Sequence, residues 1–142
     1  MGKARDITSA TSSVSMLSTN GITDFEGYSA DDIFTADSVD FVETRIGVDG
    51  KMSAGYVPQI KTVTFNFEAS SKSLPSLLNL YAISEATRTP VFVTLTVFIP
   101  AISKKFICEG VMKGTKPMYD AKKTLEPMPI KFDFESIIPM PI

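Results

Sequence analysis

Alternation of apolar and polar residues is the clearest signal along the chain, and it is strong between residues 59 and 69. Val63, Phe65 and Phe67 occupy every second position in this segment. Their polar neighbours are Thr62, Thr64, Asn66 and Glu68. Because a period of two is typical of a strand with one packed face, the spacing predicts a strand whose three apolar side chains point inward.

Three further strands are predicted in the second half of the chain. The segment "TPVFVTLTVFIP" places apolar residues at every second position over residues 91–99. The next segment, "KKFICEGVMKG", is its expected antiparallel partner. Residues 130–136 alternate again, and the expected inward residues of this last strand are Met128, Ile130, Phe132 and Phe134. Residues 115–127 keep no period, which predicts a loop.

A change of period after residue 70 predicts the one helix. Apolar residues recur there at i, i+3, i+4 and i+7, the spacing of a helix that packs along one side. These packing residues are Leu74, Leu77, Leu78 and Tyr81. Ser73 is the expected N-cap, and Pro75 is compatible with the first turn. We expect the helix to cover part of a sheet.

The N-terminal third has a weaker pattern. "SSVSML" predicts a short strand before the turn signal "TNGI", and Ile33, Val39 and Phe41 are the expected inward residues of the segment that follows. Residues 47–58 begin with a tight-turn signal at Asp49 and Gly50 and contain few apolar residues. They predict an extended arm.

Taken in order, these elements predict a single domain over residues 1–142 that is mainly β with one helix, with a flexible N-terminus at residues 1–12. Short connections favour an antiparallel β-sandwich or incomplete barrel. Residues 91–99 are too apolar for an exposed edge, so they must lie centrally or pair with another subunit. Pairing between subunits would produce a ring whose sheets join into a continuous barrel.

The polar faces of the predicted strands have two interpretations. In a ring they would line a lumen, whereas in a monomeric sandwich they would simply face solvent. The residues concerned are Thr62, Thr64, Asn66, Glu68, Lys131, Asp133 and Glu135. Alternation alone does not distinguish a lumen from bulk water.

Composition narrows the chemistry. The 142 residues include no histidine and one cysteine, Cys108, which excludes an internal disulfide, Cys/His zinc sites and a histidine general base. We therefore expect no enzymatic activity, no metal and no cofactor, and a buried Cys108. The formal net charge of −2 gives no basic stripe for nucleic acid. No apolar run reaches ~18 residues, so the sequence predicts no membrane span.

The succession of motifs resembles bacteriophage tail tube proteins of the myovirus type. From about Ser13 onward the chain shows a glycine-containing turn, a strand ending in "GVDG", an arm, a strand, a Ser/Pro-capped helix and three closing strands. The resemblance implies a homohexameric ring, stacked in many copies into the hollow tube that conducts phage DNA from capsid to host. The inner-tube proteins of pyocins and type VI secretion share this fold, and the lack of an appended domain favours a contractile tail.

The resemblance also implies roles for particular residues. The residues of the inter-subunit arm would be Gly47, Val48, Asp49, Gly50, Lys51, Met52 and Tyr56. The implied partners are further copies of the chain and the tail sheath, tape measure, baseplate and tail terminator proteins. DNA would pass without specific binding, no membrane insertion is expected, and the chain would belong to the virion tail after assembly in the host cytoplasm.

Two alternatives stay open. The chain would otherwise be a monomeric β-sandwich that serves as a binding or accessory module, with the arm as a long hairpin loop. It would also fit the inner tube of a phage-derived secretion or bacteriocin particle. Rings or hollow rods in electron micrographs favour a tube, and a stable monomeric mass favours the module.

Overall fold

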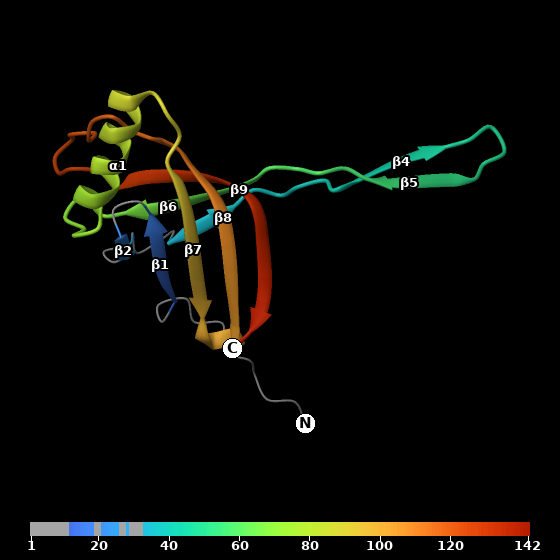
Figure 1. Ribbon diagram of the computed structural model, residues 1–142, viewed down its shortest axis with the longest axis horizontal. Helices are drawn as coiled ribbons and strands as arrows, with labels where there is room; N and C mark the ends of the chain where they lie inside the picture. The colour runs from blue at the N-terminus through green and yellow to red at the C-terminus, as the bar shows by residue number, and fades with distance from the viewer. Residues whose placement is uncertain (1–11, 19–20, 26–27, 29–32) are drawn as a thin grey trace.

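The computed structural model describes residues 12–18, 21–25, 28 and 33–142, so nearly all of the expected flexible N-terminus lies outside the described residues. Strands dominate the described chain, which has one α-helix and one short 3-10 helix (Figure 1). In chain order the elements are β1 Ser13–Ser18, β2 Gly21–Asp24, β3 Phe34–Ala36, β4 Val42–Ile46, β5 Met52–Tyr56, β6 Lys61–Phe67, α1 Leu74–Thr87, β7 Phe92–Ile99, η1 Pro100–Ile102, β8 Lys104–Thr115 and β9 Met128–Pro141. The expected class, mainly β with one helix, is confirmed.

A seven-stranded antiparallel sheet forms the body, in the order β2-β1-β7-β8-β9-β6-β3. β7 lies between β1 and β8, so the most apolar strand is central and has no exposed edge. The sheet ends at the short strands β2 and β3, which do not pair with each other in the described part of the chain. The sheet of a single chain is therefore not a closed barrel, because its two outermost strands remain apart.

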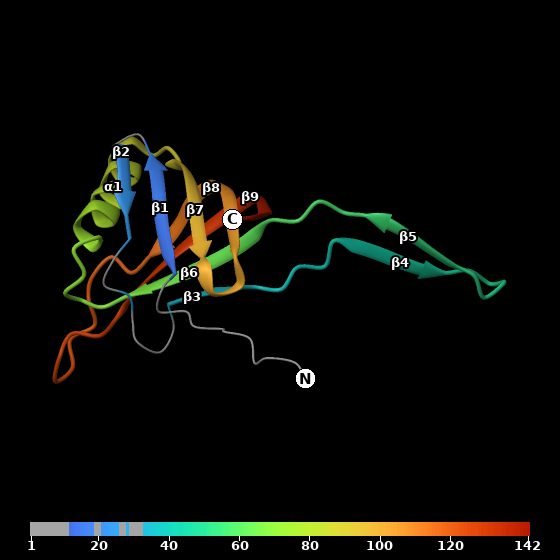
Figure 2. The ribbon, with the colours of Figure 1, turned by 90° about the horizontal axis from the view of Figure 1, so that it is seen from below.

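The sheet folds back around one hydrophobic core. β9 pairs with β8 along most of its length but with β6 only over residues 128–134, so it joins the two halves of the sheet. Figure 2 shows β3 and β6 running obliquely across the direction of β1, β7 and β8. Phe25, directly after β2, bridges the halves: its ring centroid lies 5.5 Å from that of Phe65 and 6.3 Å from that of Phe132.

The inward faces predicted for the strands are confirmed by burial. The buried residues of β6 and β9 are Val63, Phe65, Phe67, Met128, Ile130, Phe132 and Phe134. On β7, Val93, Leu95 and Val97 are buried as well, and Cys108 of β8 is 3% exposed. The prediction for Phe41 was wrong: its side chain is 58% exposed because this residue lies in a segment that leaves the body.

Gly110 allows β8 and β9 to approach closely where their register shifts. Glu109 pairs with Ser136 whereas Gly110 pairs with Phe134, so Glu135 is the extra residue of a bulge. A Cβ atom at Gly110 would lie 2.0 Å from the carbonyl oxygen of Asp133. Only glycine, which has no Cβ, allows the two backbones to lie this close. The bulge also bends the strand pair.

Helix α1 lies at the end of the body opposite the arm (Figure 1). Leu74 and Leu77 are buried, and Leu78 packs against the core. Tyr81 is not part of this contact: Leu80 is the third buried leucine, because the face that meets the sheet follows an i, i+3, i+6 spacing.

Tyr81 instead lies beside Glu85, whose charge raises the pKa of the phenol. At the start of α1, Ser73 makes no side-chain capping bond. Its hydroxyl donates to the Asp24 carbonyl at 3.1 Å and so ties the helix to β2.

Candidate assembly interface

A second, two-stranded sheet projects from the body as a hairpin (Figure 1). It consists of β4 and β5, paired from Val42 opposite Tyr56 to Ile46 opposite Met52. We define the arm as residues 37–60, the whole segment between β3 and β6. The expected arm over residues 47–58 was too short, because it omitted β4, the strand that pairs with β5.

The tip of the arm is a three-residue turn built by Asp49 and Gly50. The Gly50 N–H donates to the Gly47 carbonyl at 2.9 Å, and Gly50 has a φ of 79°. The Asp49 side chain accepts a hydrogen bond from the Lys51 N–H at 3.1 Å. A turn followed by a left-handed glycine is typical of three-residue hairpins, so the tip is determined locally.

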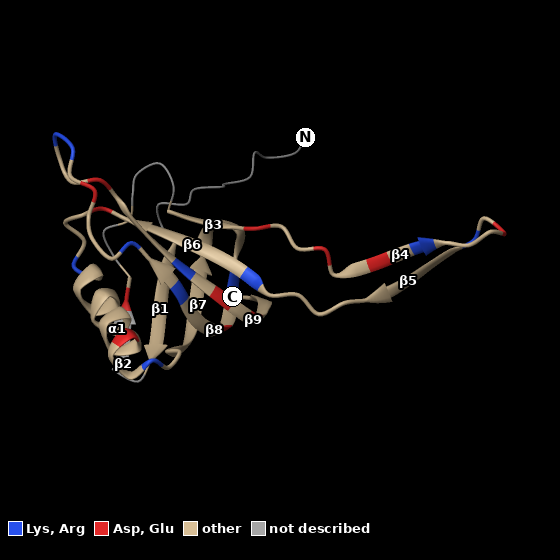
Figure 3. Ribbon diagram, turned by 90° about the horizontal axis from the view of Figure 1, so that it is seen from above, with Lys and Arg blue, Asp and Glu red and all other residues tan. Residues whose placement is uncertain are grey.

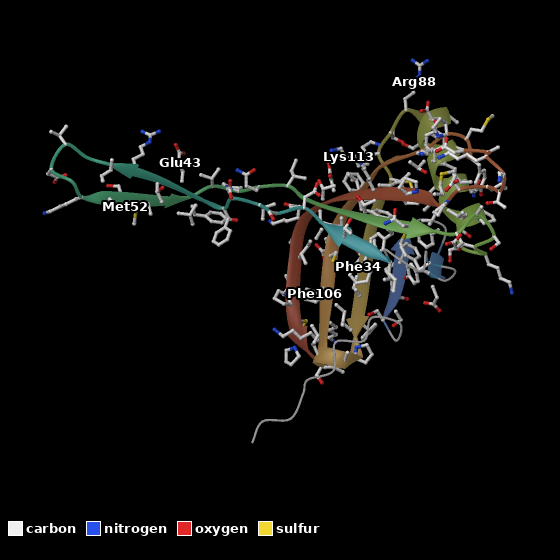
Figure 4. All side chains as sticks on the ribbon, turned by 180° about the vertical axis from the view of Figure 1, so that it is seen from behind. Phe34, Glu43, Met52, Arg88, Phe106 and Lys113 are labelled. Atoms are coloured by element: carbon white, nitrogen blue, oxygen red, sulfur yellow. The ribbon has the colours of Figure 1, made fainter. Side chains whose placement is uncertain are left out.

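The arm has one apolar face and one polar face. Cross-strand pairing places Val42 with Tyr56 and Ile46 with Met52 on the same side. The opposite side carries Glu43 and Arg45, whose side chains form an ion pair at 3.3 Å. Figure 4 shows the labelled side chains of Glu43 and Met52 on opposite sides of the ribbon. β5 carries no charged residue, whereas β4 carries one of each sign (Figure 3).

The apolar face of the arm is uncovered. The exposed fractions of its four large side chains range from 44% for Val42 to 76% for Ile46. All ten residues of β4 and β5 are exposed. An isolated two-stranded hairpin is marginally stable in water, and a contiguous apolar patch is typical of an interaction site. The arm therefore has the features of a segment stabilised by a partner.

A groove of about 1070 Å³ opens where the arm leaves the body. One wall is the root of the arm, from Tyr56 to Lys61, and the other is formed by β1, β7, β8 and β9. Four exposed apolar or aromatic residues line it: Leu17, Tyr56, Ile60 and Phe92. Three carboxylates line it as well: Glu109, Asp133 and Glu135.

Most of the residues considered for a lumen share the face of the sheet that points away from the core. Thr62 of β6 pairs with Asp133 of β9, and its hydroxyl donates to that carboxylate at 2.6 Å. Thr64 pairs with Lys131 in the next row, and Lys113 lies 3.7 Å from Asp133.

The remaining lumen candidates lie around these rows. Asn66 continues the same face at the end of β6, and Glu68 directly follows that strand. Glu135 is the exposed bulge residue of β9. The structure thus gathers these polar groups on one surface of the monomer.

No group of three or more His, Cys, Asp or Glu among the described residues is placed to hold a metal ion. Burial raises the pKa of the Cys108 thiol to about 11, which is consistent with packing. Helices of the described chain are too short or too polar to cross a membrane.

Sequence reasoning missed the apolar face of the arm and the groove. A signal was present: Val42, Thr44 and Ile46 alternate with Glu43 and Arg45. Its partner strand, "MSAGY", has two large apolar residues separated by small ones, which hid the period. The groove joins residues far apart in sequence, so no local pattern indicated it.

Two comparisons identify the chain as a phage-tail-like structural component. The chain belongs to the family described as "Tail fiber protein gp32", whose sequence model matches residues 5–138. A chain of the anti-feeding prophage (AFP) baseplate, solved by cryo-EM with 6-fold symmetrisation, has the same fold. The match has a TM-score of 0.58 at 10% identity and covers 99% of this chain and 98% of that one. No curated protein matches the sequence.

Proposed function

We propose that the chain self-assembles into stacked homohexameric rings that form the hollow tube of a contractile phage tail. The observation that carries this proposal is the arm, whose apolar face is not covered by any described residue. A surface of this kind is stable in water when another copy covers it. The six-fold baseplate that contains a chain of the same fold supports a ring of six.

The polar face of the sheet suits the wall of a DNA channel. A channel should not hold the duplex, because each neutralised phosphate adds affinity through counterion release. Asp133 is held by Thr62 and Lys113, so this face carries balanced charges and hydroxyls. In the tube, DNA would pass along this face without specific binding.

The proposed role is structural and involves no catalysis. The chain would be made in the host cytoplasm and become part of the virion tail. Its neighbours there would be the sheath outside the tube, the tape measure protein inside it, and baseplate and terminator proteins at its ends. An inner tube of a phage-derived secretion or bacteriocin particle would use the same arm.

Electron microscopy of the purified chain tests the proposal. Negative staining over a range of protein and salt concentrations should show rings or hollow rods. Light scattering on the same samples should give masses in multiples of a hexamer. A chain that stays monomeric under all these conditions would contradict the tube.

The family description favours a second candidate, an accessory module linked to tail fibres. In this role the groove at the root of the arm would bind a segment of another tail protein, and the chain would be monomeric by itself. A monomeric mass together with capture of a purified fibre protein would support this role over the tube.

A further inference from the structure

We propose that the groove at the root of the arm receives the tip half of the arm of a second copy. This inference rests on the self-assembly proposed above and adds the surface that the arm occupies. Ile46 and Met52, the pair nearest the tip, would lie against Leu17, Ile60 and Phe92 of the neighbour.

Exposed apolar surface occurs on both sides of the proposed contact. Ile46 and Met52 are 76% and 70% exposed, and Phe92 of the groove is 69% exposed. Phe92 lies on the face of β7 that points away from the core, so its side chain does not contribute to the folding of its own body. Contact between these two exposed apolar surfaces would bury both of them, which favours association.

Beside Lys61 in the groove and Asp49 at the tip, the two surfaces carry unpaired charges of opposite sign. Lys51, at the tip of the arm, forms no ion pair with any described residue. The same holds for Glu109 and Glu135 in the groove, since Lys61 donates to the backbone carbonyl of Glu135 and not to its carboxylate. A cation beside apolar residues therefore faces carboxylates beside apolar residues, which selects the orientation of the arm.

The geometry requires the two surfaces to belong to different copies. The arm points away from the body (Figure 1). The groove lies at the root of the arm. The three-residue turn holds the tip at the far end of the hairpin. Because the tip half of the arm and the groove are different surfaces, the contact is heterologous, and it propagates into a ring or a filament instead of stopping at a dimer.

Disulfide trapping tests this docking. The variant M52C/F92C, assembled and then oxidised with copper phenanthroline, should give a ladder of covalent multimers on a non-reducing gel. The ladder should disappear with dithiothreitol. The native Cys108 is buried and can remain, and the unmodified chain shows whether it contributes.

The matched control is E43C/F92C, which moves the cysteine to the polar face of the same arm. This variant should form rods without a ladder. If M52C/F92C forms rods but gives no ladder, the docking is contradicted. An equally strong ladder from E43C/F92C would contradict it as well. Neither result would contradict the proposed tube. An unmodified chain that forms no assembly would contradict the tube and this contact together.

Substitution without cysteine gives an independent measurement. F92A should raise the protein concentration at which rods first form by about tenfold, corresponding to ~1.4 kcal/mol. E43A, on the polar face, should change it by less than about twofold, since exposed ion pairs contribute little. An F92A variant that assembles like the unmodified chain would contradict the groove as the docking site.

Discussion

At the scale of single residues, aromatic rings hold the two halves of the folded sheet together. Phe132 of β9 contacts Phe25, Phe65 and Phe134, with centroid distances from 5.7 to 6.3 Å. These rings come from both sides of the core and are fully or nearly fully buried. Phe92 is of the same type and lies in the same sheet, yet it faces outward.

Replacement of Phe132 by alanine should therefore lower the free energy of unfolding by about 3 to 5 kcal/mol, because it leaves a cavity among buried rings. F92A should change it by less than about 0.5 kcal/mol in the monomer, since that side chain is exposed. Urea denaturation at a concentration where the protein is monomeric measures both. Equal losses would show that Phe92 is buried in the monomer.

The close approach at Gly110 makes a second prediction at this scale. G110A places a Cβ 2.0 Å from the Asp133 carbonyl oxygen, so β8 and β9 must separate, and the denaturation midpoint should fall clearly. G55A is the control, because no atom lies within 4 Å of a Cβ built there and the residue is on the exposed arm. A tolerated G110A would contradict the role of the bulge.

At the scale of elements, the sequence predicted best the strands with two chemically distinct faces. Val63, Phe65 and Phe67 alternate strictly with polar residues, and the structure buries all three. β4 was expected only through the resemblance, as a strand ending in "GVDG", and its own alternation was not assigned to the arm. Phe41 was expected inside because it is apolar, but apolarity does not tell whether the chain's own body covers a side chain.

The arm should be dispensable for folding, because β4 and β5 contribute no residue to the core. The Val57 N–H donates to the Phe41 carbonyl at 2.9 Å, so an Asn-Gly turn can replace residues 42–56 without displacing the ends. We expect an unchanged unfolding midpoint for the body and a complete loss of rods. Calorimetry and electron microscopy measure the two effects.

E43Q/R45Q is the control for this deletion, as it removes the arm's ion pair and keeps its apolar face. This variant should still assemble. Rods from the deletion variant would show that the body alone carries the contacts between copies.

At the scale of the whole molecule, the body protects the edges of its sheet. The outermost strands β2 and β3 are only four and three residues long. Beyond Phe134, β9 has no partner on the side of β6, and there Pro139 and Pro141 lack an N–H. Short edges and prolines disfavour strand pairing between copies, so the proposed association depends on the arm.

Association through an apolar arm predicts a particular response to salt. Rods should persist from about 0.05 M to about 1 M sodium chloride, because screening weakens charge pairs but not apolar contacts. Ammonium sulfate should lower the concentration needed for assembly. Sedimentation of rods across this series measures the effect, and dissociation at high sodium chloride would indicate an interface dominated by charge.

The hairpin form of the arm also has a consequence for timing. An isolated two-stranded hairpin is only marginally stable. When the first two copies meet, the entropy cost of ordering an arm is therefore offset by a single contact between them. In the proposed tube, a copy that joins an existing ring would contact several neighbours at once. We expect growth to begin after a delay and to start at once when short fragments are added. Unassembled chain would then accumulate until a preformed surface is present. The component that provides this surface would determine where and when polymerisation begins.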